Sequence, residues 1–218
     1  MSLEVAIIDY EMGNLFSVEQ ACRFVGLKAE ITHDKSKIAN AKAMILPGVG
    51  AFADAMENLK KRDLIDIMGQ HIEGQKPFLG ICLGMQLLMS ESHEFGRTKG
   101  LEIIEGDVVR LDNPPEGSKK VLKVPQVGWN QIKKIPRNRN GKNILHDILE
   151  EDYLYFVHSF YVRPKNPDVV CATTRYGQIE FCSSLQKDNV FACQFHPERS
   201  GWAGLKIYRN FASIVRGE

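Results

Sequence analysis

The stretch "PFLGICLGMQLL", residues 77–88, places a single cysteine between two glycines, at the end of an apolar run and directly before a helix-forming segment. A short apolar run predicts a buried strand, and the apolar residues that follow predict a helix. Small neighbours permit a tight turn at the cysteine. The stretch therefore predicts the strand-turn-helix unit of an α/β fold, with Cys82 at the turn.

Outward from this unit, the first half of the chain alternates between strand-like and helix-like segments. Apolar strand-like runs separated by helices are typical of a parallel sheet that is covered on both faces. The expected strands are residues 4–9, 28–33, 43–50 and 77–81, and the expected helices are residues 14–27, 52–74 and 83–92.

After Gly100 the pattern changes to shorter extended pieces, which are typical of antiparallel or mixed β structure. These pieces are residues 101–111, 154–162, 168–176, 179–185 and 190–195, and a helix is expected at 204–217. We therefore predict an α/β fold with a mostly parallel central sheet flanked by helices, and a smaller antiparallel or mixed β portion in the second half. One domain is expected to span residues 1–218.

The composition favours a small substrate. Lys and Arg number 28 and Asp and Glu 27, for a net charge of +1, and they are scattered along the 218 residues, so no basic stripe suggests nucleic acid. Five cysteines without close spacing, and an N-terminus without a secretory leader, predict free thiols in the cytoplasm. No apolar stretch is long enough to span a bilayer, so a soluble protein is expected.

Gly80, Cys82 and Gly84 fit the pattern G-x-C-x-G, the cysteine form of the nucleophile elbow, in which a strained turn exposes the central side chain. The helix that follows favours a thiolate, and the Leu83 N–H can point at an oxyanion. The competing interpretation is a small core hydrophobe, the usual fate of a free cysteine. We accept it for Cys22, Cys171, Cys182 and Cys193, and favour a nucleophile at Cys82.

A cysteine nucleophile needs a base, and His196 is the best candidate. It follows the strand-like run "VFACQF" and begins "HPE", so Glu198 can accept a hydrogen bond from the imidazole and fix its tautomer. Taken alone, the tripeptide also fits a solvated turn. His158 is expected to line the core or a pocket. The other histidines stand in polar settings and carry no expected role: His33, His71, His93 and His146.

The segment "GVGAFA", with Gly48, Gly50 and Ala53, also matches a relaxed dinucleotide fingerprint. It follows the third strand instead of the first, and no acidic residue ends a strand about twenty residues later, where the fingerprint requires one. A turn of backbone N–H groups serves an oxyanion equally well, and we favour that interpretation.

Together, "LPGVG", "GICLGMQLL" and "QFHPE" closely resemble the class I (triad-type) glutamine amidotransferases. More narrowly, "DYEMGNL", "VGWNQI", "YFVHSFYV" and "FHPERSGWAGLKIYRNF" look like the glutaminase subunits of imidazole glycerol phosphate synthase. The resemblance runs from about Ile8 to Phe211. It implies hydrolysis of L-glutamine to glutamate and ammonia through a γ-glutamyl thioester, with no cofactor and no metal.

The resemblance assigns roles by position. Cys82 attacks the amide, His196 moves the proton and Glu198 orients His196. The N–H groups of Val49 and Leu83 form the oxyanion hole, and one peptide of "PGVG" must turn to complete it. The residues expected around the substrate are Gly48, Gly50, Gln86, Glu94, Ser159 and Phe160.

The resemblance also implies that the ammonia travels to a separate (β/α)₈-barrel cyclase subunit, in a heterodimer that makes imidazole glycerol phosphate and an aminoimidazole carboxamide ribonucleotide. This sequence departs from that pattern at Gln126, usually histidine, and at Glu11, usually glycine. The alternatives are a paralogous subunit that feeds a cell-surface sugar amidotransferase, a free-standing cysteine γ-glutamyl hydrolase and a non-catalytic module. The intact Cys82, His196 and Glu198 argue against the last.

Overall fold

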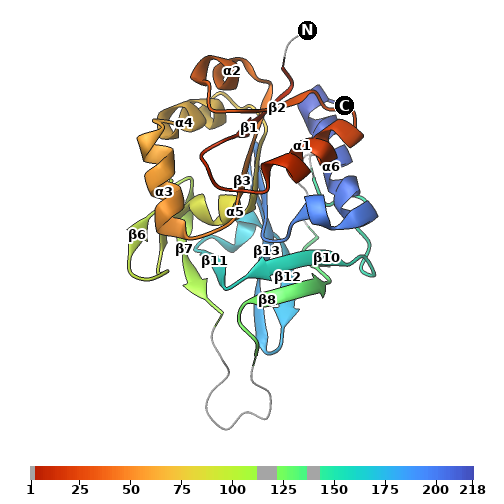
Figure 1. Ribbon diagram of the computed structural model, residues 1–218. Helices are drawn as coiled ribbons and strands as arrows, with labels where there is room; N and C mark the ends of the chain where they lie inside the picture. Colours follow the sequence, from red (N-terminus) through yellow and green to blue (C-terminus); the bar gives the residue numbers. More distant parts are fainter. Residues whose placement is uncertain (1–2, 112–121, 137–142) are drawn as a thin grey trace.

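A computed structural model describes residues 3–111, 122–136 and 143–218 (Figure 1). The first half contains β1 (Val5–Ile8), α1 (Leu15–Phe24), β2 (Ala29–Thr32), α2 (Lys35–Asn40), β3 (Ala43–Gly48), α3 (Phe52–Lys61), α4 (Ile65–Glu73), β4 (Phe78–Cys82), α5 (Leu83–Leu87), β5 (Met89–Ser92), β6 (Thr98–Lys99) and β7 (Ile104–Arg110). The second half contains β8 (Gln126–Asn130), β9 (Lys133–Lys134), β10 (Leu154–His158), β11 (Phe160–Pro164), η1 (Pro167–Val169), β12 (Val170–Tyr176), β13 (Ile179–Lys187), β14 (Val190–Cys193), η2 (Pro197–Arg199) and α6 (Gly201–Arg216).

The central sheet has the strand order β2-β1-β3-β4-β14-β13-β12-β9. The pairs from β2 to β14 are parallel, and β13, β12 and β9 continue the sheet with antiparallel pairs. A β10-β8 pair and a β11-β7-β5-β6 sheet complete the β structure. The mostly parallel sheet and the mixed second half are therefore confirmed, and β14 lies next to the strand that carries Cys82.

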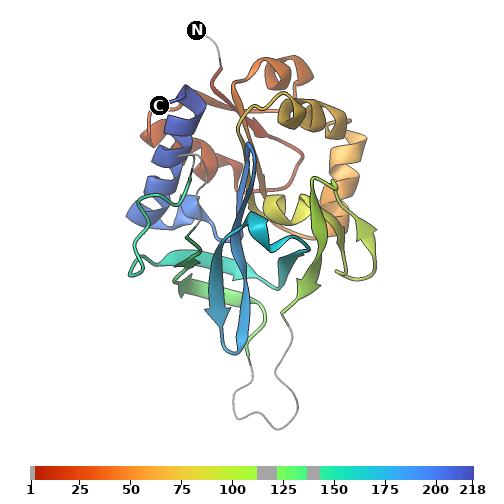
Figure 2. The same ribbon diagram turned by 180° about the vertical axis from the view of Figure 1, so that it is seen from behind.

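Helices cover both faces of the central sheet, as Figures 1 and 2 show, with α1 and α6 on one face and α2 to α5 on the other. Alternate residues of each strand supply the two cores. In β1, Val5 and Ile7 join the cluster under α1 and α6, while Ala6 and Ile8 join the cluster under α2 to α5. Side chains on a strand point alternately to its two faces, so a doubly covered strand must be apolar throughout.

Two predicted helices were wrong in detail, and one helix was missed. The expected helix 52–74 is two helices, α3 and α4, separated at Asp63, whose φ of 52° ends the first. The expected helix 83–92 ends at Leu87, and Met89–Ser92 is strand β5, which pairs with β6 and β7. Sheet pairing there overrides local helix preference. The short helix α2 was missed, although Asp34 caps it by accepting from the N–H groups of Ser36 and Lys37.

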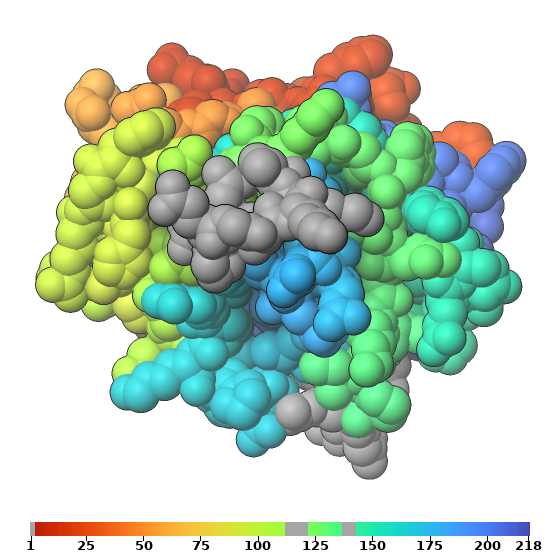
Figure 3. All heavy atoms as spheres, turned by 90° about the horizontal axis from the view of Figure 1, so that it is seen from below, coloured from red at the N-terminus to blue at the C-terminus, as the bar shows by residue number. Residues whose placement is uncertain are grey.

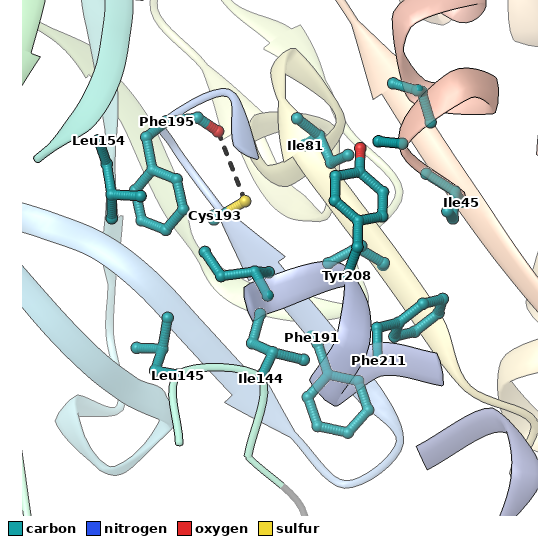
Figure 4. Close-up of a cluster of buried hydrophobic side chains, with 14 of the residues drawn as sticks. Ile45, Ile81, Ile144, Leu145, Leu154, Phe191, Cys193, Phe195, Tyr208 and Phe211 are labelled. Atoms are coloured by element: carbon teal, nitrogen blue, oxygen red, sulfur yellow. Dashed lines mark hydrogen bonds between the residues drawn. The ribbon is translucent and has the colours of Figure 1, made fainter. Parts of the chain in front are cut away.

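The cysteines other than Cys82 lie in the core, as expected. All five are buried, and none forms a disulfide within the described residues. Figure 4 shows Cys193 among Ile81, Tyr208 and Phe191, with its sulfur 3.4 Å from the Phe195 carbonyl oxygen. The polar setting expected for His71 was wrong, because its side chain is buried and bonds to the Pro77 carbonyl. Within the part of the chain that the structure describes, no helix is long and apolar enough to cross a membrane.

Candidate active site

The turn between β4 and α5 is strained at the cysteine. Cys82 has φ 54° and ψ −107°, a conformation that costs free energy in a residue with a side chain. The glycines around it leave no room for a Cβ atom. A Cβ on Gly84 would lie 1.8 Å from the Leu46 carbonyl oxygen, and one on Gly80 would lie 2.9 Å from the Gly84 oxygen. The G-x-C-x-G pattern therefore meets the packing requirement of this turn.

The strained backbone at Cys82 directs its side chain towards β10 and the segment after β14. Its sulfur lies 4.0 Å from the Val157 carbonyl oxygen and 3.6 Å from the amide nitrogen of Gln194. Leu83 is the first residue of α5, so its N–H belongs to the group that helix geometry leaves without an intrahelical partner. A thiol and a free N–H are thus adjacent in sequence at one turn.

His196 and Glu198 form a buried pair beyond the end of β14. The Nδ1 atom of His196 lies 2.8 Å from a carboxylate oxygen of Glu198, and both side chains are almost fully buried. The backbone of His196 is also held, because its N–H donates to the Tyr155 carbonyl and its own carbonyl accepts from the Ser200 hydroxyl. The histidine is therefore fixed in position and tautomer.

The charge state of His196 depends on its two neighbours. Burial lowers its pKa, but the Cys82 sulfur and the Glu198 carboxylate together raise it by more, so the net pKa lies above the ordinary value of 6.5. Among the described residues, the buried Nε2 atom of His196 has no hydrogen-bond partner. The structure thus brings Cys82, His196 and Glu198 together, in the order that a nucleophile, base and orienting carboxylate require.

The "PGVG" turn lies next to the nucleophile. Gly48 is paired with Cys82 between β3 and β4, so Val49 directly follows the residue opposite the cysteine, and Val49 is 42% exposed. Gly48 has no room for a Cβ because the Tyr10 hydroxyl would lie 2.3 Å away, and Gly50, with φ 114°, faces a methyl group of Met12. The Tyr10 hydroxyl also donates to the Pro47 carbonyl at 2.7 Å. The turn is therefore packed against residues 10–12.

The side chains of Gln86 and Glu94 both form hydrogen bonds within the protein. One carboxylate oxygen of Glu94 accepts from the Phe52 N–H at 2.6 Å, so this residue supports the start of α3 directly behind the "PGVG" turn. The Nε2 atom of Gln86 donates to the Phe160 carbonyl at 3.0 Å and to the Gln194 side-chain oxygen at 3.2 Å. Only its own carbonyl oxygen is left for another molecule.

Ser159 and Phe160 connect β10 to β11. The Ser159 carbonyl accepts from the Leu111 N–H, and the Phe160 carbonyl accepts from Gln86 and from Nδ1 of His158. A carboxylate can only accept, so a carboxylate bound at this segment would have to take its backbone N–H groups. His158 is buried, and burial lowers its pKa to about 4.

The two positions that depart from the resemblance lie in different surroundings. Gln126 is buried opposite His158 in the β8-β10 pair, and its side-chain oxygen has no hydrogen-bond partner in the part of the chain that the structure describes. Glu11 has φ 67°, in the left-handed region that glycine adopts at little cost, and its carboxylate is paired with Arg62. Glu11 thus forms an ion pair with Arg62 at a position whose backbone conformation favours glycine.

Sequence reasoning missed two site residues, Tyr10 and Gln194. Gln194 falls inside the quoted motif "QFHPE", two residues before His196, which was the available signal. Nothing in the sequence pointed from Tyr10 to Pro47 in β3, because the two residues are 37 positions apart. Among the described residues, no group of three or more His, Cys, Asp or Glu side chains is placed to hold a metal ion.

Residues 6–214 match the family model described as glutamine amidotransferase class-I. The chain belongs to the class-I glutamine amidotransferases. It is an enzyme of that family. Two curated relatives, each called imidazole glycerol phosphate synthase subunit HisH, are 50% identical in Caldanaerobacter subterraneus subsp. tengcongensis (97% of this chain and 98% of the relative) and 45% identical in Syntrophotalea carbinolica (96% and 100%).

Solved structures share the amidotransferase fold at low sequence identity. One described as a glutamine amidotransferase has a TM-score of 0.71 at 19% identity, covering 98% of this chain and 99% of the other. PurLQS from Thermotoga maritima gives a TM-score of 0.71 at 18% identity, with the same coverage. The resemblance noted from the motifs is therefore confirmed at the level of family and fold.

Proposed function

We propose that this chain is the glutaminase subunit of an imidazole glycerol phosphate synthase, with residues 1–218 acting as one domain in the cytoplasm. The observation that carries the proposal is the strained Cys82 turn beside the buried His196–Glu198 pair. The names and high identity of the curated relatives support the pathway.

In the proposed reaction, the Cys82 thiolate attacks the side-chain amide carbon of L-glutamine. The oxyanion is stabilised by the N–H groups of Leu83 and Val49. The C–N bond then breaks, and His196 gives its proton to the leaving nitrogen, which departs as ammonia. A water molecule attacks the thioester, His196 takes its proton, and glutamate leaves as the thiolate is restored. Glu198 holds the imidazole throughout.

The substrate would be held around this centre. The free carbonyl oxygen of Gln86 is suited to a substrate donor, and the N–H groups near Ser159 and Phe160 are suited to the α-carboxylate. Glu94 would act mainly through the turn that it supports, together with Gly48 and Gly50.

A separate (β/α)₈-barrel cyclase is the proposed partner and ammonia acceptor. Val127 and Trp129 on β8 are 59% and 55% exposed, and Trp129 packs on Tyr155, whose carbonyl holds the backbone of His196. Exposed apolar side chains of this kind mark interaction surfaces. Residues 122–136, in green, lie on the face shown in Figure 3 beside the blue β12–β13 hairpin.

Glutamate release tests this proposal. We expect the purified chain alone to be a poor glutaminase, because one misdirected oxyanion donor costs roughly 10²- to 10³-fold in rate. The cognate barrel subunit with its aminoimidazole-type ribonucleotide should restore that loss. Full activity of the chain alone would favour a free-standing hydrolase. Activation by a barrel subunit that ignores this nucleotide would favour the sugar-aminating alternative.

A further inference from the structure

A chain of side-chain amides ends at the nucleophile. Gln194 is fully buried between β14 and His196. Its Nε2 atom donates to the Cys82 sulfur at 3.6 Å, and its Oε1 atom accepts from Nε2 of Gln86 at 3.2 Å. The same nitrogen of Gln86 donates to the Phe160 carbonyl at 3.0 Å. This chain of hydrogen bonds therefore connects the distant segments of Phe160, Gln86 and Gln194 to the Cys82 sulfur.

The direction of this chain is fixed by the backbone. The Phe160 carbonyl can only accept, so Gln86 must present its NH₂ group there, and the second hydrogen of that group faces Gln194. Gln194 must then present its oxygen to Gln86, and its NH₂ group is left facing Cys82. A reversed Gln194 amide would set two NH₂ groups against each other, and a reversed Gln86 amide would set its oxygen against the Phe160 carbonyl oxygen. Cys82 is therefore required to accept, which is what a thiolate does best.

The contacts of Gln194 place it on the side of the active site. Cys193 and Phe195 pack in the core shown in Figure 4, whereas Gln194 and His196 both interact with Cys82. The Gln194 N–H donates to the Ser183 carbonyl at 3.0 Å, which fixes the backbone. The amide and the imidazole therefore reach Cys82 from one short segment.

We propose that Gln194 is a positioning residue that holds the Cys82 sulfur as a hydrogen-bond acceptor and so stabilises its thiolate form. This inference rests on the proposed role of Cys82 as nucleophile. Hydrogen bonds to an ionised partner are stronger than neutral ones, and burial strengthens them further. Gln194 also ties the nucleophile to Gln86, a residue expected to contact the substrate. The titratable groups that interact with this sulfur are Tyr10 after β1, Cys193 in β14 and His196.

Alkylation of Cys82 by iodoacetamide, measured against pH by peptide mass spectrometry on the full chain, tests this role without using glutamine. Gln194→Met removes the donor at similar volume, and Gln194→Glu keeps the shape but replaces the donor with an acceptor. We expect both to move the midpoint of alkylation upward by about one pH unit, which slows alkylation about tenfold below the midpoint. Gln186→Met on β13 is the matched control, and it should leave the profile unchanged, because its amide donates to Asp188.

Kinetics give the second readout. Loss of the thiolate should lower kcat by roughly the same factor by which it lowers the rate of alkylation. The change in KM should be smaller. A residue that only fills space would change the thermal midpoint without moving the alkylation profile. If Gln194→Met does not fold, Gln194→Glu decides the question.

An unchanged alkylation profile in a folded variant overturns the role of Gln194. If Cys82→Ala still lacks glutaminase activity, the proposed function survives that result. If Cys82→Ala remains active, the proposed function fails first, and the role of Gln194 fails with it.

Discussion

Cys82 and Cys193 are the last residues of neighbouring parallel strands, and both are buried, yet their side chains have different surroundings. Cys193 lies in the core, where its sulfur contacts the Phe195 carbonyl, and burial raises the pKa of its thiol well above 9.0. Cys82 ends its strand in a left-handed conformation that turns its sulfur towards His196 and Gln194. The comparison teaches that backbone direction at a strand end, more than burial, distinguishes the proposed nucleophile from a cysteine of the core.

Exchanging each cysteine for alanine should give the largest contrast. Cys82→Ala is expected to lower glutaminase turnover by roughly 10⁴-fold or more, because no other group can form the thioester. Cys193→Ala should keep its turnover and lose about 1 kcal/mol of stability, since it removes only a small core side chain. Glutaminase assays and urea unfolding of both variants measure this. Appreciable turnover by Cys82→Ala would contradict the assignment.

His196 and Glu198, which follow β14, should contribute unequally to catalysis. His196→Ala removes the proton carrier, whereas Glu198→Gln leaves the base in place with a weaker partner. We expect the loss of kcat for Glu198→Gln to be roughly tenfold to a hundredfold smaller than for His196→Ala. Steady-state kinetics on both variants, with circular dichroism as the folding control, distinguish the roles. Equal losses would mean that Glu198 does more than orient the imidazole.

Alanine substitutions at two glycines test the strained turn that carries Cys82. Gly84→Ala should destabilise the fold by about 3 kcal/mol or more, because its Cβ would meet backbone that cannot move easily. Gly69→Ala in α4 meets nothing within 4 Å and should stabilise the protein by about 1 kcal/mol. Urea unfolding midpoints report both changes. A harmless Gly84→Ala would show that the turn tolerates other geometries.

The smallest effect is expected at the start of β4, where His71 bonds to the Pro77 carbonyl at 3.2 Å. Burial lowers the pKa of His71 to about 4, against 6.5 in an exposed chain. Between these values the unfolded chain binds a proton that the folded chain does not, so stability falls as pH falls. His71→Gln should flatten this dependence. Urea unfolding at pH 7.5, 6 and 4.5 measures it, and an unchanged slope would exclude His71 as a source.

The sequence motifs predicted the residues of the candidate catalytic centre better than the contacts that hold its surroundings in place. Cys82, His196 and Glu198 were placed at strand ends from local pattern alone, and the structure brings them together at the β4 and β14 ends. Their roles stay predictions until the variants are measured. The contact of Glu94 with the substrate also stays a prediction, and one oxygen of its carboxylate accepts from the Phe52 N–H at the start of α3. Nothing in the sequence near Glu94 indicates that contact, because Phe52 lies 42 residues away.

The sequence by itself determined the α/β class, the strand-turn-helix at Cys82 and the family, because these depend on periodicity and on small residues at fixed spacing. Only the tertiary structure decided that β14 lies against β4, that residues 89–92 form a strand, and that Gln86 and Gln194 connect Phe160 to the nucleophile. Each of these depends on contacts between segments distant in sequence. Local preference carries no information about such contacts, since hydrogen bonds form wherever folding brings a donor to an acceptor.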